Sequence, residues 1–105
     1  MTHKIIIDTE KQLKDAIIAE VEDAYNKLNE AKQKFRSAQN TVELAKEALR
    51  LANLMYDEGA NTQLDVLNSR LALTQAQMSY ANSLFEYQVA RYQLRKVTGQ
   101  LKNVI

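Results

Sequence analysis

Residues 57–65 read Asp-Glu-Gly-Ala-Asn-Thr-Gln-Leu-Asp, and they contain the clearest interruption of an otherwise helical sequence. The chain has 105 residues, no proline and only two glycines. Gly59 suits the left-handed conformation that commonly ends a helix. Thr62 followed by Asp65 fits a capping box, which begins a helix. A link of only residues 59–61 predicts that two helices fold back on each other as an antiparallel hairpin.

The sequence before this link has a strict apolar period. Between Gln12 and Glu58, apolar residues recur in alternating steps of four and three, which is typical of a long coiled-coil helix. The period is also sorted by size, because every seventh residue from 24 to 52 is alanine. The alternate row is large and consists of Val21, Leu28, Phe35, Val42, Leu49 and Tyr56. A row of small residues allows a neighbouring helix to approach closely.

The signals at the ends of the helices give boundaries within a single domain. Thr9 with Gln12 fits a second capping box, and Asp8 is the rival cap. Gly99 marks the predicted end of the second helix. Ile5–Ile7 is compatible with an extended lead-in or with a first helical turn. The prediction is a lead-in tail over 1–8, a helix over 9–58, a turn over 59–61, a helix over 62–98 and a tail over 99–105.

The second predicted helix carries two apolar stripes with the same period. The first consists of Leu64, Leu67, Leu71, Thr74, Met78, Ala81, Phe85, Gln88 and Tyr92. The second consists of Val66, Ser69, Leu73, Ala76, Tyr80, Ser83, Tyr87, Ala90, Leu94 and Val97. Pairing Tyr56 with Leu64, and Phe35 with Phe85, keeps both partners equally far from Ala60, as a hairpin centred there requires. We therefore expect the first stripe to pack on the first helix.

The second stripe is then expected to have no partner within the chain. Its members Val66, Leu73, Ala76, Tyr80, Tyr87, Ala90 and Leu94 are predicted to form a helix–helix interface with further helices, since monomers rarely expose such a face. The first helix adds a stripe near the turn, made of Leu44, Ala48, Leu51 and Met55. The predicted fold is all-α: a long antiparallel two-helix coiled-coil hairpin that associates into a larger helical bundle or barrel. For the isolated chain we expect a dimer.

Composition argues against several classes of function. The chain has 14 Lys+Arg, 13 Asp+Glu and a net charge of +1, which is unlike a dedicated nucleic-acid binder. Without cysteine and with His3 as its one histidine, it offers no catalytic or metal-binding cluster, so we expect neither an enzyme nor a cofactor. No apolar run is long enough for a transmembrane helix, and Ile5–Ile7 is too short for a signal peptide.

The tip sequence resembles a known family. The stretch Leu54–Leu67, with a tyrosine three residues before a glycine, a short turn and then Leu-Asp-Val-Leu, is similar to the tip hairpin of TolC-family outer-membrane efflux and secretion channels. The resemblance covers about residues 12–99 and continues through the residues Leu73, Gln75, Ala76, Gln77, Tyr80, Tyr87, Ala90, Leu94, Thr98 and Gly99. It implies the second periplasmic hairpin of a channel built from three protomers, in the periplasmic part of a Gram-negative outer-membrane protein.

The resemblance also implies roles for individual residues. The tip that docks a periplasmic adaptor protein corresponds to Gly59, Ala60, Asn61, Thr62 and Leu64. Asp65 matches an acid that lines the pore aperture. Asn68 lies where some members carry a second aperture acid. Tyr56 matches a tyrosine that latches the closed state in some members, whereas Asn61 stands where some members have a basic residue.

Two other readings of the chain remain open from its sequence. A cytoplasmic coiled-coil scaffold would use the free stripe only to dimerise. An amphipathic helix lying on a membrane is disfavoured, because a membrane-facing stripe requires no sorting by size. Asp65 has a purely structural reading as a capping acid, and Asp65 with Asn68, one turn apart, also forms a polar face that could line a lumen.

Overall fold

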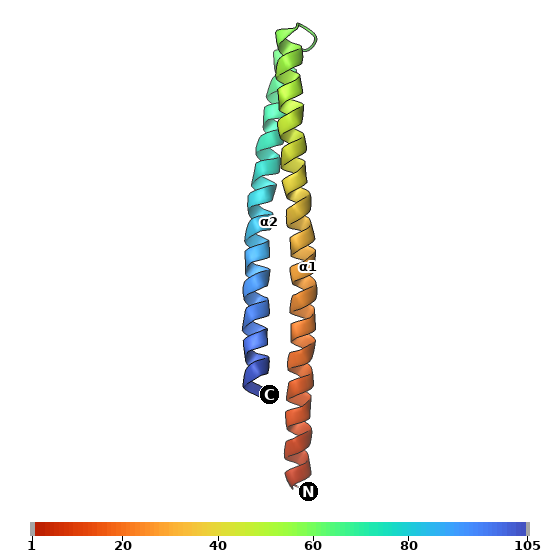
Figure 1. Ribbon diagram of the computed structural model, residues 1–105, viewed down its shortest axis with the longest axis vertical. Helices are drawn as coiled ribbons and strands as arrows, with labels where there is room; N and C mark the ends of the chain where they lie inside the picture. The colour runs from red at the N-terminus through yellow and green to blue at the C-terminus, as the bar shows by residue number, and fades with distance from the viewer. Residues whose placement is uncertain (1, 105) are drawn as a thin grey trace. The chain divides into compact units, whose positions relative to one another are not determined.

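The computed structural model describes the backbone of residues 2–104 and the side chains of residues 4–103. It contains two helices, α1 (Thr2–Asp57) and α2 (Gln63–Val104), which are joined by residues 58–62 (Figure 1). The chain divides into two compact units. We call residues 32–86 the tip unit, and residues 2–31 with 87–104 the terminal unit. The described residues form no strand, and the predicted all-α helical hairpin is confirmed.

Helix α1 begins earlier than the sequence analysis predicted. Residues 2–8 are helical, not a lead-in tail, and Met1 lies outside the described residues. Thr9 does not cap the helix: its hydroxyl donates to the carbonyl oxygen of Ile5 at 2.9 Å, a bond typical of threonine inside a helix. Residues 2–8 contain neither glycine nor proline, so nothing interrupts the helical bonding of the backbone.

Helix α2 runs beyond its predicted end. It continues through Gly99 to Val104, and Ile105 lies outside the described residues. Among the described residues, positive φ occurs at Gly59, so Gly99 keeps an ordinary helical backbone. A glycine inside a helix costs about 0.5–1 kcal/mol relative to alanine, which is too little to end a helix that is packed on a neighbour.

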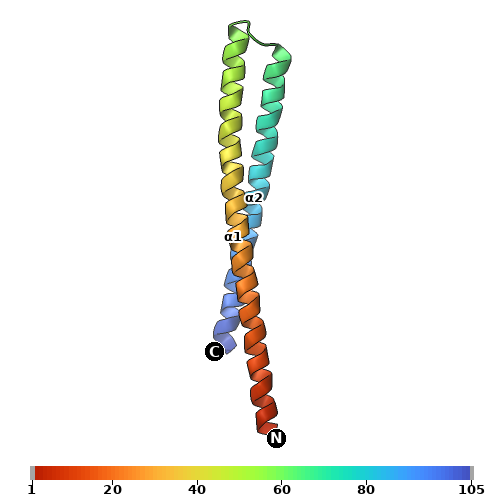
Figure 2. The same cartoon turned by 90° about the vertical axis from the view of Figure 1, so that its right-hand side faces the viewer.

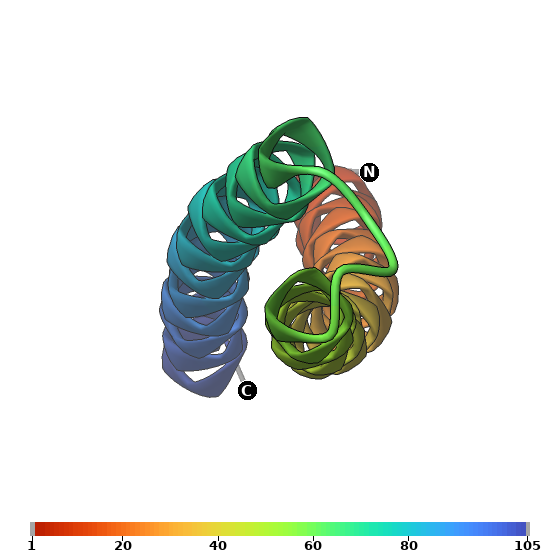
Figure 3. The same cartoon turned by 90° about the horizontal axis from the view of Figure 1, so that it is seen from above.

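The end of α1 is fixed by a Schellman motif. The amide of Ala60 donates to the carbonyl of Met55 at 2.7 Å, and the amide of Gly59 donates to the carbonyl of Tyr56 at 3.0 Å. Gly59 has a φ of +77°, which confirms the predicted left-handed position. The chain then crosses to the start of α2, as the green link in Figure 3 shows.

The packing between the helices of the tip unit reverses one prediction. Val66 and Ala76 are 9% and 7% exposed, and Ser83 is 3% exposed. These residues belong to the second stripe, which was expected to lack a partner. The first stripe is instead exposed, with Leu64 at 63% and Phe85 at 70%. In Figures 1 and 2 the helices of this unit lie side by side. The burial of the second stripe indicates that it is the side of α2 that packs on α1.

The prediction for α1 is confirmed by burial. Val42 and Ala52 are buried in the tip unit, and Phe35, Ala38, Ala45 and Leu49 are half-buried. In the terminal unit, Ile17 and Ala24 are buried on α1, while the α2 residues Tyr87, Ala90, Leu94 and Val97 are half-buried. Tyr56, at 45% exposure, is the member of the predicted α1 row nearest the link. The second stripe of α2 is therefore the internal face within each unit.

Candidate functional site

The start of α2 is held by a reciprocal capping box. The amide of Thr62 donates to a carboxylate oxygen of Asp65 at 3.0 Å, and the amide of Asp65 donates to the Thr62 hydroxyl at 3.3 Å. The Thr62 hydroxyl also donates to the same carboxylate at 3.0 Å. The predicted capping box is therefore present, and α2 begins at Gln63, directly after Thr62.

The capping box changes the acidity of Asp65. Hydrogen bonds from the Thr62 amide and then from the Thr62 hydroxyl lower the pKa of the Asp65 carboxyl. The carboxylate is thus held ionised at the N-terminus of α2, where negative charge is favoured. Asp65 and Asn68 are both exposed. A charged, solvent-facing Asp65 is compatible with a pore-lining role, although its visible partner is Thr62.

Asn61 turns inward rather than outward. Its Nδ2 donates to the carbonyl oxygen of Ala52 at 3.1 Å, so the link is tied to the last turns of α1. Its Oδ1 is buried and accepts no hydrogen bond from any residue that the structure describes. Sequence reasoning treated Asn61 as part of an exposed docking tip, and the structure gives its side chain a contact inside the hairpin as well.

A groove opens beside the link in the tip unit. We call it the tip groove; its volume is about 460 Å³, and it is lined by Asn53, Tyr56, Gln63, Leu64, Val66, Leu67 and Arg70. Leu64 and Leu67 are 63% and 53% exposed there, and Tyr56 is 45% exposed. The groove thus brings together three predicted site residues: Tyr56 from α1, and Leu64 and the buried Val66 from α2.

Sequence reasoning missed four other residues of the tip groove: Asn53, Gln63, Leu67 and Arg70. Leu67 had been assigned to the packed face, and Arg70 lies one turn beyond it on α2. Leu64, Leu67 and Arg70 are spaced three residues apart, which places them on one side of a helix. This spacing indicates a common surface once the internal face of α2 is assigned to the second stripe. The Arg70 guanidinium makes no ion pair with any described residue, so a positive charge borders an apolar groove.

An exposed apolar stripe runs along α2 in the tip unit. We call it the outer stripe; it consists of Leu64, Leu67, Leu71, Met78 and Phe85, which are between 53% and 70% exposed. Helix α1 adds exposed apolar residues near the link: Leu44, Leu51, Leu54 and Met55. The predicted second stripe of α1 is therefore exposed as expected. Apolar faces of this extent are typical of surfaces that meet other helices.

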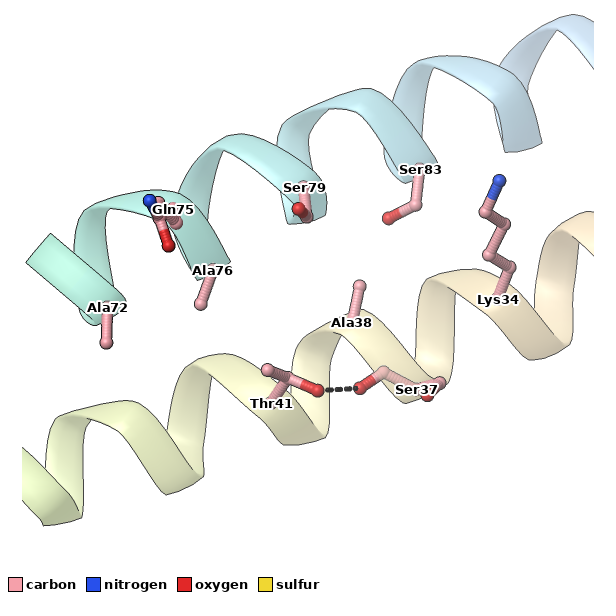
Figure 4. Close-up of a pocket in the computed structure, with 9 residues that line it drawn as sticks. All are labelled: Lys34, Ser37, Ala38, Thr41, Ala72, Gln75, Ala76, Ser79 and Ser83. Carbon is pink, nitrogen blue, oxygen red and sulfur yellow. Dashed lines mark hydrogen bonds between the residues drawn. The ribbon is translucent and has the colours of Figure 1, made fainter.

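A second groove in the tip unit is lined mainly by small residues. Its volume is about 520 Å³, and Figure 4 shows Ala38 from α1 and Ala76 and Ser83 from α2 pointing into the space between the helices. Lys34 stands at one end and pairs with Glu86 across the helices at 3.2 Å. The Ser83 hydroxyl donates to the Tyr80 carbonyl at 2.8 Å, so this buried polar group has a partner.

The residues predicted to form an interface with further helices lie elsewhere than expected. Val66 and Ala76 are buried between α1 and α2 in the tip unit, and Leu73 and Tyr80 are half-buried there. Tyr87, Ala90 and Leu94 are half-buried in the terminal unit. They hold the hairpin itself together. The apolar stripe of α2 that stays exposed in the tip unit is the outer stripe.

Comparison with known proteins identifies the family. The family described as outer membrane efflux protein matches residues 3–100. The chain belongs to the outer membrane efflux protein family. Nodulation protein T from Rhizobium leguminosarum bv. trifolii is 33% identical over 70 residues, which cover 67% of this chain and 15% of that protein. No solved structure matches the chain significantly.

Membership of the outer membrane efflux protein family agrees with the predicted resemblance to TolC-like channels. This is a family of transport proteins of the outer membrane. The chain spans about 15% of the length of the relative it matches. Over residues 2–104, neither helix contains a stretch that is both long and apolar enough to cross a membrane. The described residues also contain no group of three or more acidic, histidine or cysteine side chains that could hold a metal; the side chain of His3 lies outside them.

Proposed function

We propose that this chain is a periplasmic α-barrel hairpin of a TolC-like outer-membrane efflux or secretion channel. In this role the hairpin forms part of the conduit wall, and its tip docks a periplasmic adaptor protein. The observation that carries the proposal is the family match over residues 3–100, which includes the whole link and most of each helix that flanks it. The match favours a channel component over a cytoplasmic coiled-coil scaffold.

The geometry of the link supports a docking tip. A Schellman motif ends α1, and a capping box begins α2, so the backbone of the link is bonded on both sides. The tip groove beside it exposes Leu64 and Leu67 next to the unpaired cation of Arg70. Apolar side chains beside a cation suit an adaptor helix end that carries an apolar residue and a carboxylate.

The outer stripe supports the part of the proposal that concerns the conduit wall. Its residues are large, apolar and spaced for a further helix, and α1 and α2 leave them uncovered. We propose that neighbouring hairpins of a trimeric channel cover this stripe, and that Asp65 and Asn68 face the lumen. Tyr56, which lines the tip groove, would hold the closed state through a neighbouring hairpin.

Cross-linking at the tip tests the docking proposal. These 105 residues contain no cysteine, so Ala60→Cys places the one thiol of this segment at the link. With the complete channel protein and its periplasmic adaptor, we expect a thiol cross-linker at residue 60 to capture the adaptor. Asn40→Cys, at an exposed position of α1 away from the link, is the matched control.

A second variant tests the chemistry of the groove. Leu64→Gln removes an exposed apolar side chain and should weaken adaptor binding by about tenfold, the loss of roughly 1.4 kcal/mol. Its helical content and melting temperature should match those of the parent chain. A Leu64→Gln variant that folds normally and binds the adaptor as tightly as before, or equal cross-linking from residues 40 and 60, would contradict the docking proposal.

A further inference from the structure

The side chain of Asn61 reaches back from the link to α1. Its Nδ2 donates to the Ala52 carbonyl at 3.1 Å, across nine positions of the sequence. Ala52 is 7% exposed and Asn61 is half-buried, so this hydrogen bond is shielded from water. In an α-helix the same carbonyl accepts the amide four residues later, which here belongs to Tyr56. The Ala52 carbonyl is therefore an acceptor shared by Asn61, which belongs to the link, and Tyr56, which lines the tip groove.

The other end of the same side chain is unsatisfied. Oδ1 of Asn61 is buried and has no hydrogen-bond partner among the described residues. The bond to Ala52 fixes the orientation of the amide, because a flipped amide would set Oδ1 against another acceptor. With the side chain turned inward, the donor is satisfied and the acceptor is not. With the side chain turned outward into water, both groups would be satisfied.

We infer that Asn61 is a positioning residue, a releasable clamp that ties the link to α1 and holds the start of α2 in place. Gln63 and Leu64, two and three positions after Asn61, line the tip groove together with Tyr56, so the clamp sets how that groove is presented. The Schellman bonds of Gly59 and Ala60 are made by the backbone alone and do not involve the Asn61 side chain. The clamp is a property of this chain by itself, and only its bearing on docking rests on the proposed function.

Native-state hydrogen exchange measured by NMR on the full chain tests the clamp. In the unmodified chain, we expect the side-chain amide protons of Asn61 to exchange at least ten times more slowly than those of Asn82, an exposed asparagine of α2. In Asn61→Ala, exchange at the backbone amides of Thr62 and Asp65 should rise at least fivefold. Exchange at Val42 and Ala76, inside the tip unit, should change less than twofold.

Two further variants sharpen the test. Asn61→Asp keeps the shape but replaces the donor with an acceptor at neutral pH, so it should behave like Asn61→Ala. Asn82→Ala removes an exposed amide and should leave exchange unchanged. The inference is overturned if Asn61→Ala leaves Thr62 and Asp65 unaltered, or if it speeds exchange equally through the tip unit. If the variants do not fold, fast exchange of the Asn61 side chain in the unmodified chain overturns it. Since no adaptor is present, these results do not depend on docking.

Discussion

The rings of Phe35 and Tyr80 face each other across α1 and α2, with their centroids 5.3 Å apart and their planes inclined by 33°. Both residues are half-buried. This contact places Tyr80, a member of the second stripe of α2, in the core of the tip unit. Phe85, the residue that had been paired with Phe35 by its distance from Ala60, is 70% exposed.

The first prediction separates the two stripes by stability. Tyr80→Ala removes a ring that packs against Phe35 and should lower the free energy of unfolding by about 2–3 kcal/mol. Phe85→Ala removes a ring of similar size from the outer stripe and should change it by no more than about 0.5 kcal/mol. Chemical denaturation followed by circular dichroism measures both. Equal losses in the two variants would mean that the outer stripe also packs within the chain.

The second prediction contrasts the two glycines. A Cβ added at either position meets no atom of another part of the chain within 4 Å, so the two substitutions differ in the local backbone conformation alone. Gly99 has a helical backbone, and Gly99→Ala should raise the free energy of unfolding by about 0.5–1 kcal/mol. Gly59 has a φ of +77°, and Gly59→Ala should lower the free energy of unfolding by about 1–2 kcal/mol. Thermal unfolding of the two variants provides the comparison, and a stabilising Gly59→Ala would rule out the left-handed link.

The third prediction concerns acid stability. Because the Thr62 bonds lower the pKa of Asp65 in the folded chain, the carboxylate stabilises the fold at pH values above its unfolded pKa of about 4. That contribution is lost as the pH falls through the lowered folded pKa. Asp65→Asn should therefore melt below the parent chain at pH 7, and the gap should close in strong acid.

A matched control isolates the effect of the capping box. Asp15→Asn removes an exposed carboxylate of α1 for which the structure shows no hydrogen bond. It should leave the melting temperature almost unchanged at both ends of the pH range. Glu47, whose pKa is also lowered by its hydrogen bond with Arg50, is present in all three proteins and cancels from the comparison. A difference in melting temperature between Asp65→Asn and the parent chain that does not vary with pH would contradict the role of the ionised cap.

The fourth prediction concerns self-association. The outer stripe leaves five large apolar residues exposed in the tip unit, and burying them against another helix removes apolar surface from water. We expect sedimentation equilibrium to show association that increases with concentration. Replacing Leu71 and Met78 with glutamine should weaken it while leaving the melting temperature within a few degrees of the parent. A chain that stays monomeric at high concentration would show that the outer stripe does not drive association.

The local signals in the sequence predicted the link correctly but misplaced the outer ends of both helices. Gly59, Thr62 and Asp65 act through bonds to residues at most five positions away, and their motifs are present as predicted. The signals at Thr9 and Gly99 were equally local but misleading. Threonine can bond backward inside a helix, and glycine permits a helix end without requiring one.

The candidate site was predictable only in part. The family and the position of the tip follow from the motif around Gly59 and from the Leu-Asp-Val-Leu run. The groove formed by Tyr56, Leu64, Leu67 and Arg70 did not follow, since it exists only if Leu64 and Leu67 are left outside the packed face. The inward turn of Asn61 was also invisible, because it depends on a carbonyl nine residues away.

The amino-acid sequence alone determined that this protein is two antiparallel helices joined at Gly59, that the apolar row of α1 is its packed face, and that the chain resembles an efflux channel. Only the tertiary structure decided which stripe of α2 meets that row. Both stripes of α2 repeat every seven residues, so either stripe stays in register with the apolar row of α1. The seven-residue period therefore does not indicate which side of α2 faces α1. The conformation of residues 58–62 sets the rotation of α2 about its own axis, and it turns Val66, Ala76 and Tyr80 inward.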